Sequence, residues 1–241
     1  MKRFKLFTLT MALTFAAFTS FAQTADEVVS KHIEAMGGLD KLNGIKSLYA
    51  EGSLEVQGME IPFKQWILHD KGMRMDMEVM GTANSQVVTT TGGWMYMPVQ
   101  GMSEPKELTA EEAKAGQGQL DLKGELVDYK TRGIKVDLKG KETIDGVELY
   151  NLLVTKPNGE TSNIYIDTKT NLINRKAEKK NIQGQDVDIV IVFGDYKKGP
   201  EGIMTPTTLE QPAMGVNIKI NKYAYNGADV TETLFNKPAG K

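Results

Sequence analysis

Alternation of apolar and polar residues restricts the fold of this 241-residue chain more than any other feature of the sequence. Leu48, Ala50, Leu54 and Val56 take every second position of one segment, and the same period of two returns in residues 134–139, 163–167 and 216–221. Strands with one apolar and one polar face are typical of antiparallel sheets with one solvated side. The pattern therefore predicts a mainly β fold of antiparallel strands.

Turn sequences separate these segments, as hairpin connections require. Gln57-Gly58, Asp145-Gly146 and residues 157–159 combine residues that tolerate tight turns. Residues 186–193 are apolar on both alternating sets, which predicts a strand in the middle of the sheet. No repeat or Pro/Ser-rich linker divides the chain, so residues 23–241 are predicted to form a single domain.

Two capping-box patterns predict helices. Thr24 and Glu27 can each bond the other's backbone N–H, and an apolar stripe follows at helical spacing until Gly37-Gly38, which predicts a helix over residues 25–36. Thr109 and Glu112 repeat the pattern before a short helical stretch over residues 110–115. This second helix is short and polar and is followed by Gly116 and Gly118, so we expect it to pack weakly and to be able to move.

Residues 1–22 have the order of parts of a secretory signal peptide. Lys2, Arg3 and Lys5 precede a short apolar run, and residues 20–22 supply small residues before Gln23. We expect cleavage there, export, and a periplasmic location; an uncleaved N-terminal anchor is the alternative. The chain has no cysteine, and Gln23 stands where a lipoprotein would carry its lipid-modified Cys, so no stable membrane anchor is expected.

The composition argues against several function classes. A formal net charge of −2 with scattered signs gives no footprint for nucleic acid as a partner. Without cysteine, a nucleophile elbow or more than the two histidines His32 and His69, nucleophilic catalysis and a zinc site are poorly supported. We predict that the protein is not an enzyme, with no catalytic residues, no metal site and no cofactor.

Methionine is unusually concentrated in one part of the chain. Eight methionines lie between Met59 and Met102, and several of them alternate with other residues as on one face of a strand. An ordinary core, an adaptable apolar cavity and thioether coordination of Cu(I) are three interpretations of this pattern. The cavity hypothesis assigns these residues to the ligand-binding surface: Trp66, Met73, Met75, Met77, Trp94, Met95 and Met97.

Trp66 lies in a segment that is apolar on both alternating faces. Ile61, Phe63 and Ile67 form one face, and Trp66 and Leu68 belong to the other. A strand of this kind needs a cover on each side. We expect the first helix to supply one cover and a ligand or a lid to supply the other.

Several segments of the sequence resemble periplasmic outer-membrane lipoprotein-sorting proteins of the LolA-like group. The first runs from Ala25 to Tyr49 and contains Ala-Met-Gly-Gly-Leu-Asp-Lys-Leu. The others are residues 146–150, 163–167, 170–173, 194–196 and 202–206. The resemblance covers roughly residues 24–236 and rests on turns and strand patterns.

The resemblance implies a single curved antiparallel sheet, a half-open barrel wrapped around the N-terminal helix, with the helix at 110–115 as a lid. It implies a carrier that holds acyl chains of lipoproteins or lipids on the concave face, with membrane-bound donor and acceptor proteins as possible partners. A sensor or protein-interaction module of the same fold is the alternative, and a Met-rich Cu(I)-binding protein is a further one. Arg74, Arg132 and Arg175 are the candidates for the arginine with which family carriers control the lid.

Overall fold

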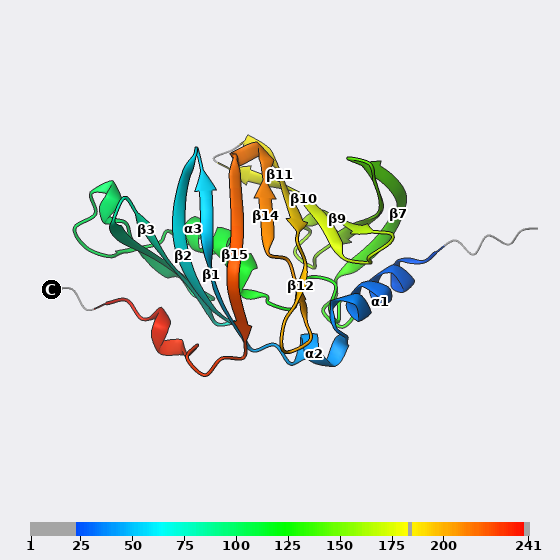
Figure 1. The fold of residues 1–241 in the computed structure, drawn as a ribbon, viewed down its shortest axis with the longest axis horizontal. Coiled ribbons are helices and arrows are strands. Elements are labelled where there is room, and N and C mark those ends of the chain that lie inside the picture. The colour runs from blue at the N-terminus through cyan, green and yellow to red at the C-terminus, as the bar shows by residue number, and fades with distance from the viewer. Residues whose placement is uncertain (1–22, 183–184, 239–241) are drawn as a thin grey trace, which may run out of the picture.

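The computed structural model describes residues 23–182 and 185–238, and the predicted signal peptide lies outside the described residues. One large antiparallel sheet of 13 strands forms most of the described chain, and its edges do not close into a barrel (Figure 1). The mainly β, antiparallel prediction is confirmed. The strands follow the order β6-β5-β4-β3-β2-β1-β15-β14-β11-β10-β9-β8-β7.

The bounds of the strands in this sheet are β1 Ser47–Val56, β2 Met59–Leu68, β3 Gly72–Val79, β4 Thr82–Thr89, β5 Gly93–Tyr96, β6 Lys106–Glu107, β7 Lys135–Ile144, β8 Val147–Thr155, β9 Thr161–Asp167, β10 Ile173–Ile182, β11 Gln185–Gly194, β14 Thr208–Gln211 and β15 Val216–Tyr225. A small hairpin of β12 (Lys197–Lys198) and β13 (Met204–Thr205) stands apart from it. The helices are α1 Ala25–Met36, α2 Leu39–Asn43 and α3 Ala110–Gln117, with short 3-10 turns that include η2 Gly118–Leu120 and η4 Glu232–Phe235.

Local sequence signals account for most of these elements. Both capping boxes form, at Thr24 with Glu27 and at Thr109 with Glu112, and α1 spans the predicted residues. Gln57 and Gly58 both have positive φ, the conformation that a two-residue hairpin turn requires between β1 and β2. The strand predicted over residues 186–193 lies within β11, which pairs with β10 on one side and β14 on the other.

Strand pairing between distant segments builds the centre of the sheet. β1 pairs with β2 on one side and with β15 on the other, so the first strand lies beside the last (Figure 1). A bulge between Glu51 and Gly52 shifts the β1–β15 register by one residue. Any surface at the middle of the sheet is therefore made from both ends of the described chain.

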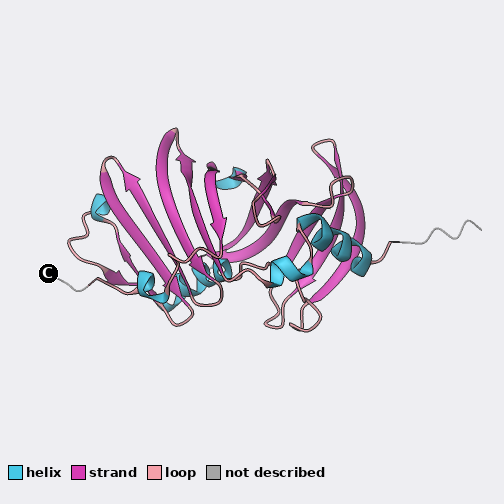
Figure 2. Cartoon of the chain, turned by 60° about the horizontal axis from the view of Figure 1, so that its bottom comes forward, coloured by secondary structure: helices cyan, strands magenta, loops and turns pink. Residues whose placement is uncertain are grey.

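The helices α1 and α3 cover the two halves of one face, which we call the helix face (Figures 1 and 2). Val28 and Val29 of α1 pack on Leu152, Val154 and Ile164 of β8 and β9. A second cluster joins α3 and η2 to strands β2 to β4, and its members are Ile67, Met73, Val88, Leu108, Ala113 and Leu120. The first helix thus packs on the half of the sheet that contains β7 to β10, and α3 packs on the other half.

The face of β2 to β5 that points away from α3 is covered by the C-terminal segment, residues 230–238. Phe235 packs with Val87 and Trp94, and the Trp94 indole Nε1 donates to the Phe235 carbonyl at 3.0 Å. A Cβ on Gly72 would lie 2.7 Å from the Phe235 ring, so glycine makes room for the phenyl group. The helix expected as the lid, α3, thus covers one face of β2, whereas the C-terminal segment covers the other face in place of the first helix.

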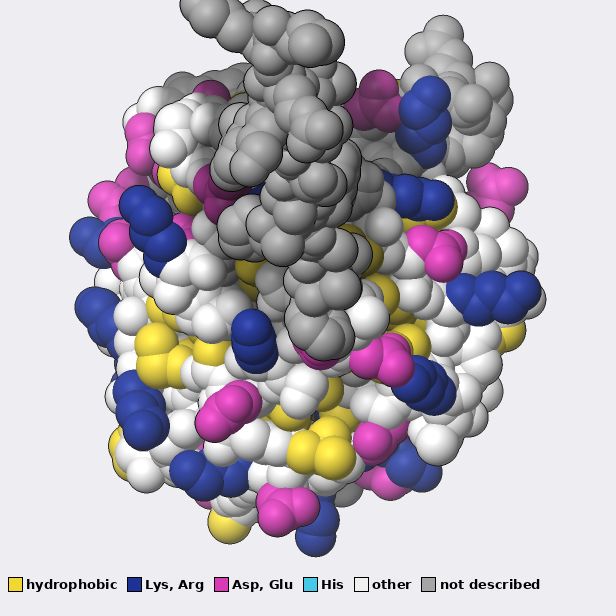
Figure 3. Space-filling model, turned by 90° about the vertical axis from the view of Figure 1, so that its right-hand side faces the viewer, with side chains coloured by type: hydrophobic (Ala, Val, Ile, Leu, Met, Phe, Trp, Pro, Cys, Tyr) yellow, Lys and Arg dark blue, Asp and Glu magenta, His cyan; other side chains and the backbone are white. Residues whose placement is uncertain are grey.

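Charges of both signs are interspersed on the end of the molecule that carries α1 and β7 (Figure 3). None of the helices within the described residues is long and apolar enough to cross a membrane.

Candidate functional site

An apolar row crosses the helix face at the centre of the sheet. Directly paired positions of five neighbouring strands supply it, and its members are Ile61, Leu54, Ile218, Leu209 and Phe193. Opposed residues of an antiparallel pair point to the same side of the sheet. All five side chains are partly exposed, in the region between the half of the sheet that α1 covers and the half that α3 covers.

A hollow of about 230 Å³ adjoins one end of the apolar row. Phe193, the last residue of the row, lines it together with Leu172, Ile173 and Tyr196. Burial raises the pKa of the Tyr196 phenol, whose hydroxyl donates to the Ile173 carbonyl at 2.8 Å. Asp167, Thr170 and Asn174 complete the lining, so the hollow combines apolar side chains with polar ones.

A second hollow, of about 270 Å³, has more polar walls. They include Thr208 and Lys219, a directly opposed pair next in sequence to Leu209 and Ile218. Because successive residues of a strand point to opposite faces, this pair points away from the apolar row. The polar walls suit an apolar ligand less well than the row does.

Four of the methionines predicted to line a cavity, Met73, Met75, Met77 and Met95, lie on the helix face. Met73 is buried beneath α3, and its sulfur accepts from Gln65 Nε2 at 3.1 Å. Met75 and Met77 follow it on the same face of β3, where both are half-buried, and Met77 is opposed to Phe63. Met95 packs at the edge of the α3 cluster, and half-buried Met97 follows β5.

The two tryptophans predicted for the same site lie on the other face of the sheet. Trp66 is opposed to Tyr49 and Arg74, and its ring lies 5.4 Å from the Tyr49 ring between centroids. Trp94 is buried against Phe235. The residue that follows each tryptophan in its strand points toward α3, and successive residues of a strand point to opposite faces. Neither tryptophan therefore contributes to the surface that the methionines form.

The helix α3 lies against β4 without a gap at its C-terminal end. A Cβ on Gly116 would lie 2.8 Å from a methyl group of Val88. The side chain of Gln117 donates to the carbonyls of Thr89 and Thr90 at 3.1 and 3.0 Å. The helix predicted over residues 110–115 is thus present, two residues longer, and held on β4 by packing and by the hydrogen bonds of Gln117.

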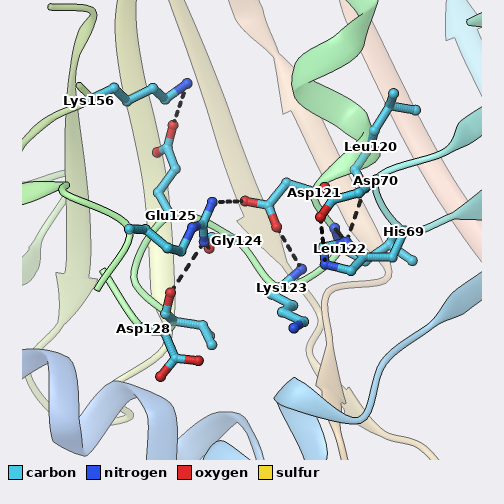
Figure 4. A network of polar contacts seen from close by, with 12 residues as sticks. His69, Asp70, Leu120, Asp121, Leu122, Lys123, Gly124, Glu125, Asp128 and Lys156 are labelled. Carbon is cyan, nitrogen blue, oxygen red and sulfur yellow. Dashed lines mark hydrogen bonds and ion pairs between the residues drawn. The ribbon is translucent and has the colours of Figure 1, made fainter. Parts of the chain in front are cut away.

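The connecting segment, residues 121–134, joins η2 to β7 and is fixed by polar contacts (Figure 4). Leu122 N–H donates to His69 Nδ1 at 3.3 Å, and Asp70 N–H donates to the Leu120 carbonyl at 3.0 Å. Arg132 bonds the Gly124 carbonyl at 2.7 Å and the Asp121 carboxylate at 2.6 Å. These bonds tie the segment that follows α3 to itself and to the β2–β3 turn.

The three candidate arginines have different surroundings. Arg132 belongs to the connecting segment that follows α3. Arg74 pairs with Asp76 on the face of the sheet that carries Trp66 and Trp94, which we call the tryptophan face. Arg175 pairs with Asp145 at 2.7 Å. Of the three, Arg132 is the nearest in sequence to the helix that would act as a lid, in the segment that follows α3 and η2.

A charged group, the Glu125 cluster, fastens the connecting segment to the sheet. Glu125 accepts from Lys156 at 2.9 Å, from Lys176 at 3.0 Å and from Ser162 at 3.3 Å, and Lys176 also contacts Glu178 at 3.4 Å. Burial acts to raise the pKa of Glu125, but the two lysines outweigh it and hold the pKa below its usual value. The carboxylate is therefore ionised and paired at neutral pH.

The sequence pattern missed both the apolar row and the Glu125 cluster as parts of a site. Alternation identified Leu54 and Ile218 as apolar positions, but it does not say that β15 lies beside β1. Glu125 lies in a segment without regular periodicity, so no local signal marks it. Within the described residues, no group of three or more His, Cys, Asp or Glu side chains could hold a metal ion.

An open antiparallel sheet with helices on one face and a short helix over part of that face is the architecture that the LolA-like resemblance implies. Solved structures confirm this fold. A DUF1329 family protein from Desulfovibrio piger has a TM-score of 0.56 and 17% identity, over 88% of this chain and 97% of that one. A LolA superfamily protein from Nitrosomonas europaea has a TM-score of 0.56 and 13% identity, over 90% and 99%.

An outer membrane lipoprotein-sorting protein domain from Vibrio parahaemolyticus is also similar, with a TM-score of 0.54 and 13% identity over 88% of this chain and 97% of that one. The sequence matches no protein-family model and no curated protein. At these identities the similarity establishes the fold, which the three structures share over nearly their whole length.

Proposed function

We propose that this protein binds the acyl chain of a lipid or lipoprotein along the helix face and carries it in the periplasm without chemical change. The apolar row is the observation that carries the proposal, because five partly exposed apolar side chains in direct register form an extended surface. The lipoprotein-sorting domain among the similar structures supports the same class of ligand.

The physical driving force is the transfer of methylene groups from water onto this surface. Each buried CH₂ contributes about 0.8 kcal/mol, so the binding free energy should grow with the length of chain that the row covers. Met75 and Met77 extend the apolar row on one side, with flexible side chains that adapt to different chains. The hollow at Phe193 extends it on the other.

Charging the centre of the surface tests this function. We expect Ile218→Asp to reduce binding of the neutral fluorescent probe N-phenyl-1-naphthylamine and of hexadecanol at least tenfold, because the carboxylate must be desolvated under the ligand. Met75→Asp tests the methionine part of the surface in the same way. Asn217→Asp is the matched control: it adds the same charge at the adjacent, exposed position on the opposite face.

Circular dichroism of each variant establishes that it is folded. Unchanged probe binding by folded Ile218→Asp would contradict the proposed site. Loss in Ile218→Asp together with full binding by Met75→Asp would restrict the site to the apolar row and exclude the methionines.

A further inference from the structure

The Glu125 cluster lies directly beside the apolar row. Lys176 of β10 is opposed to Ile191 of β11, which precedes Phe193 by two residues and points to the same face. On its other side Lys176 is opposed to Ile164, which packs in the α1 cluster. An acyl chain along the row would thus have two ammonium groups, Lys156 and Lys176, near one of its ends.

The two lysines remain accessible although they are paired. Their side chains are 30% and 23% exposed, whereas that of Glu125 is 11% exposed. Lys156 also contacts Glu160 at 3.6 Å, and Lys176 also contacts Glu178 at 3.4 Å. An anion that replaced the Glu125 carboxylate would bring a negative charge to the same two ammonium groups, so the exchange would leave neither of them without a counter-ion.

Glu125 and its partners lie in different parts of the chain. Glu125 belongs to the connecting segment after α3, whereas Ser162 belongs to β9, Lys176 belongs to β10 and Lys156 directly follows β8. Displacing its carboxylate would remove these polar contacts between the connecting segment and the sheet, whereas buried Leu126 and Val127 of the same segment would still pack in the core. Occupation of the two lysines is therefore linked to the position of the Glu125 side chain.

From this geometry we infer that the ligand is an amphiphile with an anionic head group, a carboxylate or a phosphate, which competes with Glu125 for Lys156 and Lys176. The inference rests on the proposed function, because the row must hold the acyl chain for the head group to reach the lysines. It adds a specificity that an apolar surface alone does not have.

Displacement of N-phenyl-1-naphthylamine by three sixteen-carbon amphiphiles tests the inference. Palmitate and hexadecyl phosphate carry the two anionic heads, and hexadecanol carries a neutral one. We expect both anions to bind the wild-type protein about tenfold more tightly than hexadecanol, the size of one charge-assisted hydrogen bond. A difference between palmitate and hexadecyl phosphate distinguishes the two kinds of head group.

Variants of the cluster make the test specific. Lys176→Met should remove most of the preference for the anions over hexadecanol, whereas Lys179→Met, on the opposite face of the same strand, should leave the ratio of the two affinities as it is in the wild type. Glu125→Gln should tighten palmitate binding severalfold, because the competing carboxylate is gone. Thermal unfolding of each variant checks that the cluster change has not unfolded the protein.

The outcomes of these measurements distinguish the head-group inference from the proposed carrier function. Equal binding of hexadecanol and palmitate by the wild-type protein, or weaker palmitate binding by folded Glu125→Gln, would overturn the head-group inference and leave the carrier function standing. Failure of all three amphiphiles to displace the probe would overturn both.

Discussion

Individual side chains determine how the stability of this protein depends on pH, and His32 is an example. It lies on α1, is 6% exposed, and its Nδ1 donates to the Asn171 carbonyl at 2.9 Å. Burial lowers the pKa of this imidazole, and the bond to Asn171 offsets only part of that effect. The folded protein therefore holds a neutral histidine where helix and sheet meet.

The pH dependence follows from the direction of this shift. The unfolded chain, with a histidine pKa of about 6.5, takes up a proton at a pH where the folded chain does not. The contribution of His32 to stability is thus fully present above the histidine pKa of the unfolded chain. The free energy of unfolding falls as the pH decreases from 7 to 5, by at most about 1.4 kcal/mol per pH unit. Urea denaturation at several pH values measures this slope.

The variant His32→Gln serves as the control, since it keeps an N–H donor and cannot titrate. Its free energy of unfolding should vary less between pH 7 and pH 5 than that of the wild type. Identical slopes in both proteins would show that another group is responsible.

At the scale of elements, the sequence predicted the features that depend on interactions between residues close together in the chain. The capping boxes, the hairpin turns and the alternation of β1 all recur in the structure, because hydrogen bonds between near neighbours and side-chain period fix them. Which strand lies next to which is decided by contacts between distant segments. The opposite orientation of Trp66 and Met73 follows from that register, and it divides the predicted site.

The contact of α3 with β4 gives a second prediction at this scale. We expect Gly116→Ala to destabilise the protein by about 1–3 kcal/mol, because the added methyl group would lie within 2.8 Å of Val88. Hydrogen exchange within residues 110–117 should become faster. Denaturant unfolding with exchange mass spectrometry measures both effects.

Shortening the facing side chain should relieve the clash. The double variant Gly116→Ala with Val88→Ala is expected to lose less stability than the sum of its single variants, since the new methyl group occupies the vacated space. Additive losses of stability would mean that a methyl group at position 116 does not contact the side chain of Val88 in solution.

At the scale of the whole molecule, the C-terminal segment protects the tryptophan face. We expect Phe235→Ala to destabilise the protein by about 3 kcal/mol and to shift tryptophan emission to longer wavelength, because Trp94 gains contact with water. Thr233→Ala, at an exposed position of the same segment, is the matched control and should change neither property. An unshifted spectrum for Phe235→Ala would contradict the assigned packing.

The pairing of β1 with β15 determines when during synthesis the apolar row is complete. A nascent chain contains Ile61 and Leu54 early, but it lacks Ile218 until the final strand of the sheet has been made. Early hairpins can form from neighbouring segments, whereas the five-strand surface is completed only by the last one. A chain that ends before β15 therefore lacks the assembled surface, so the proposed ligand site exists only once synthesis has passed Ile218.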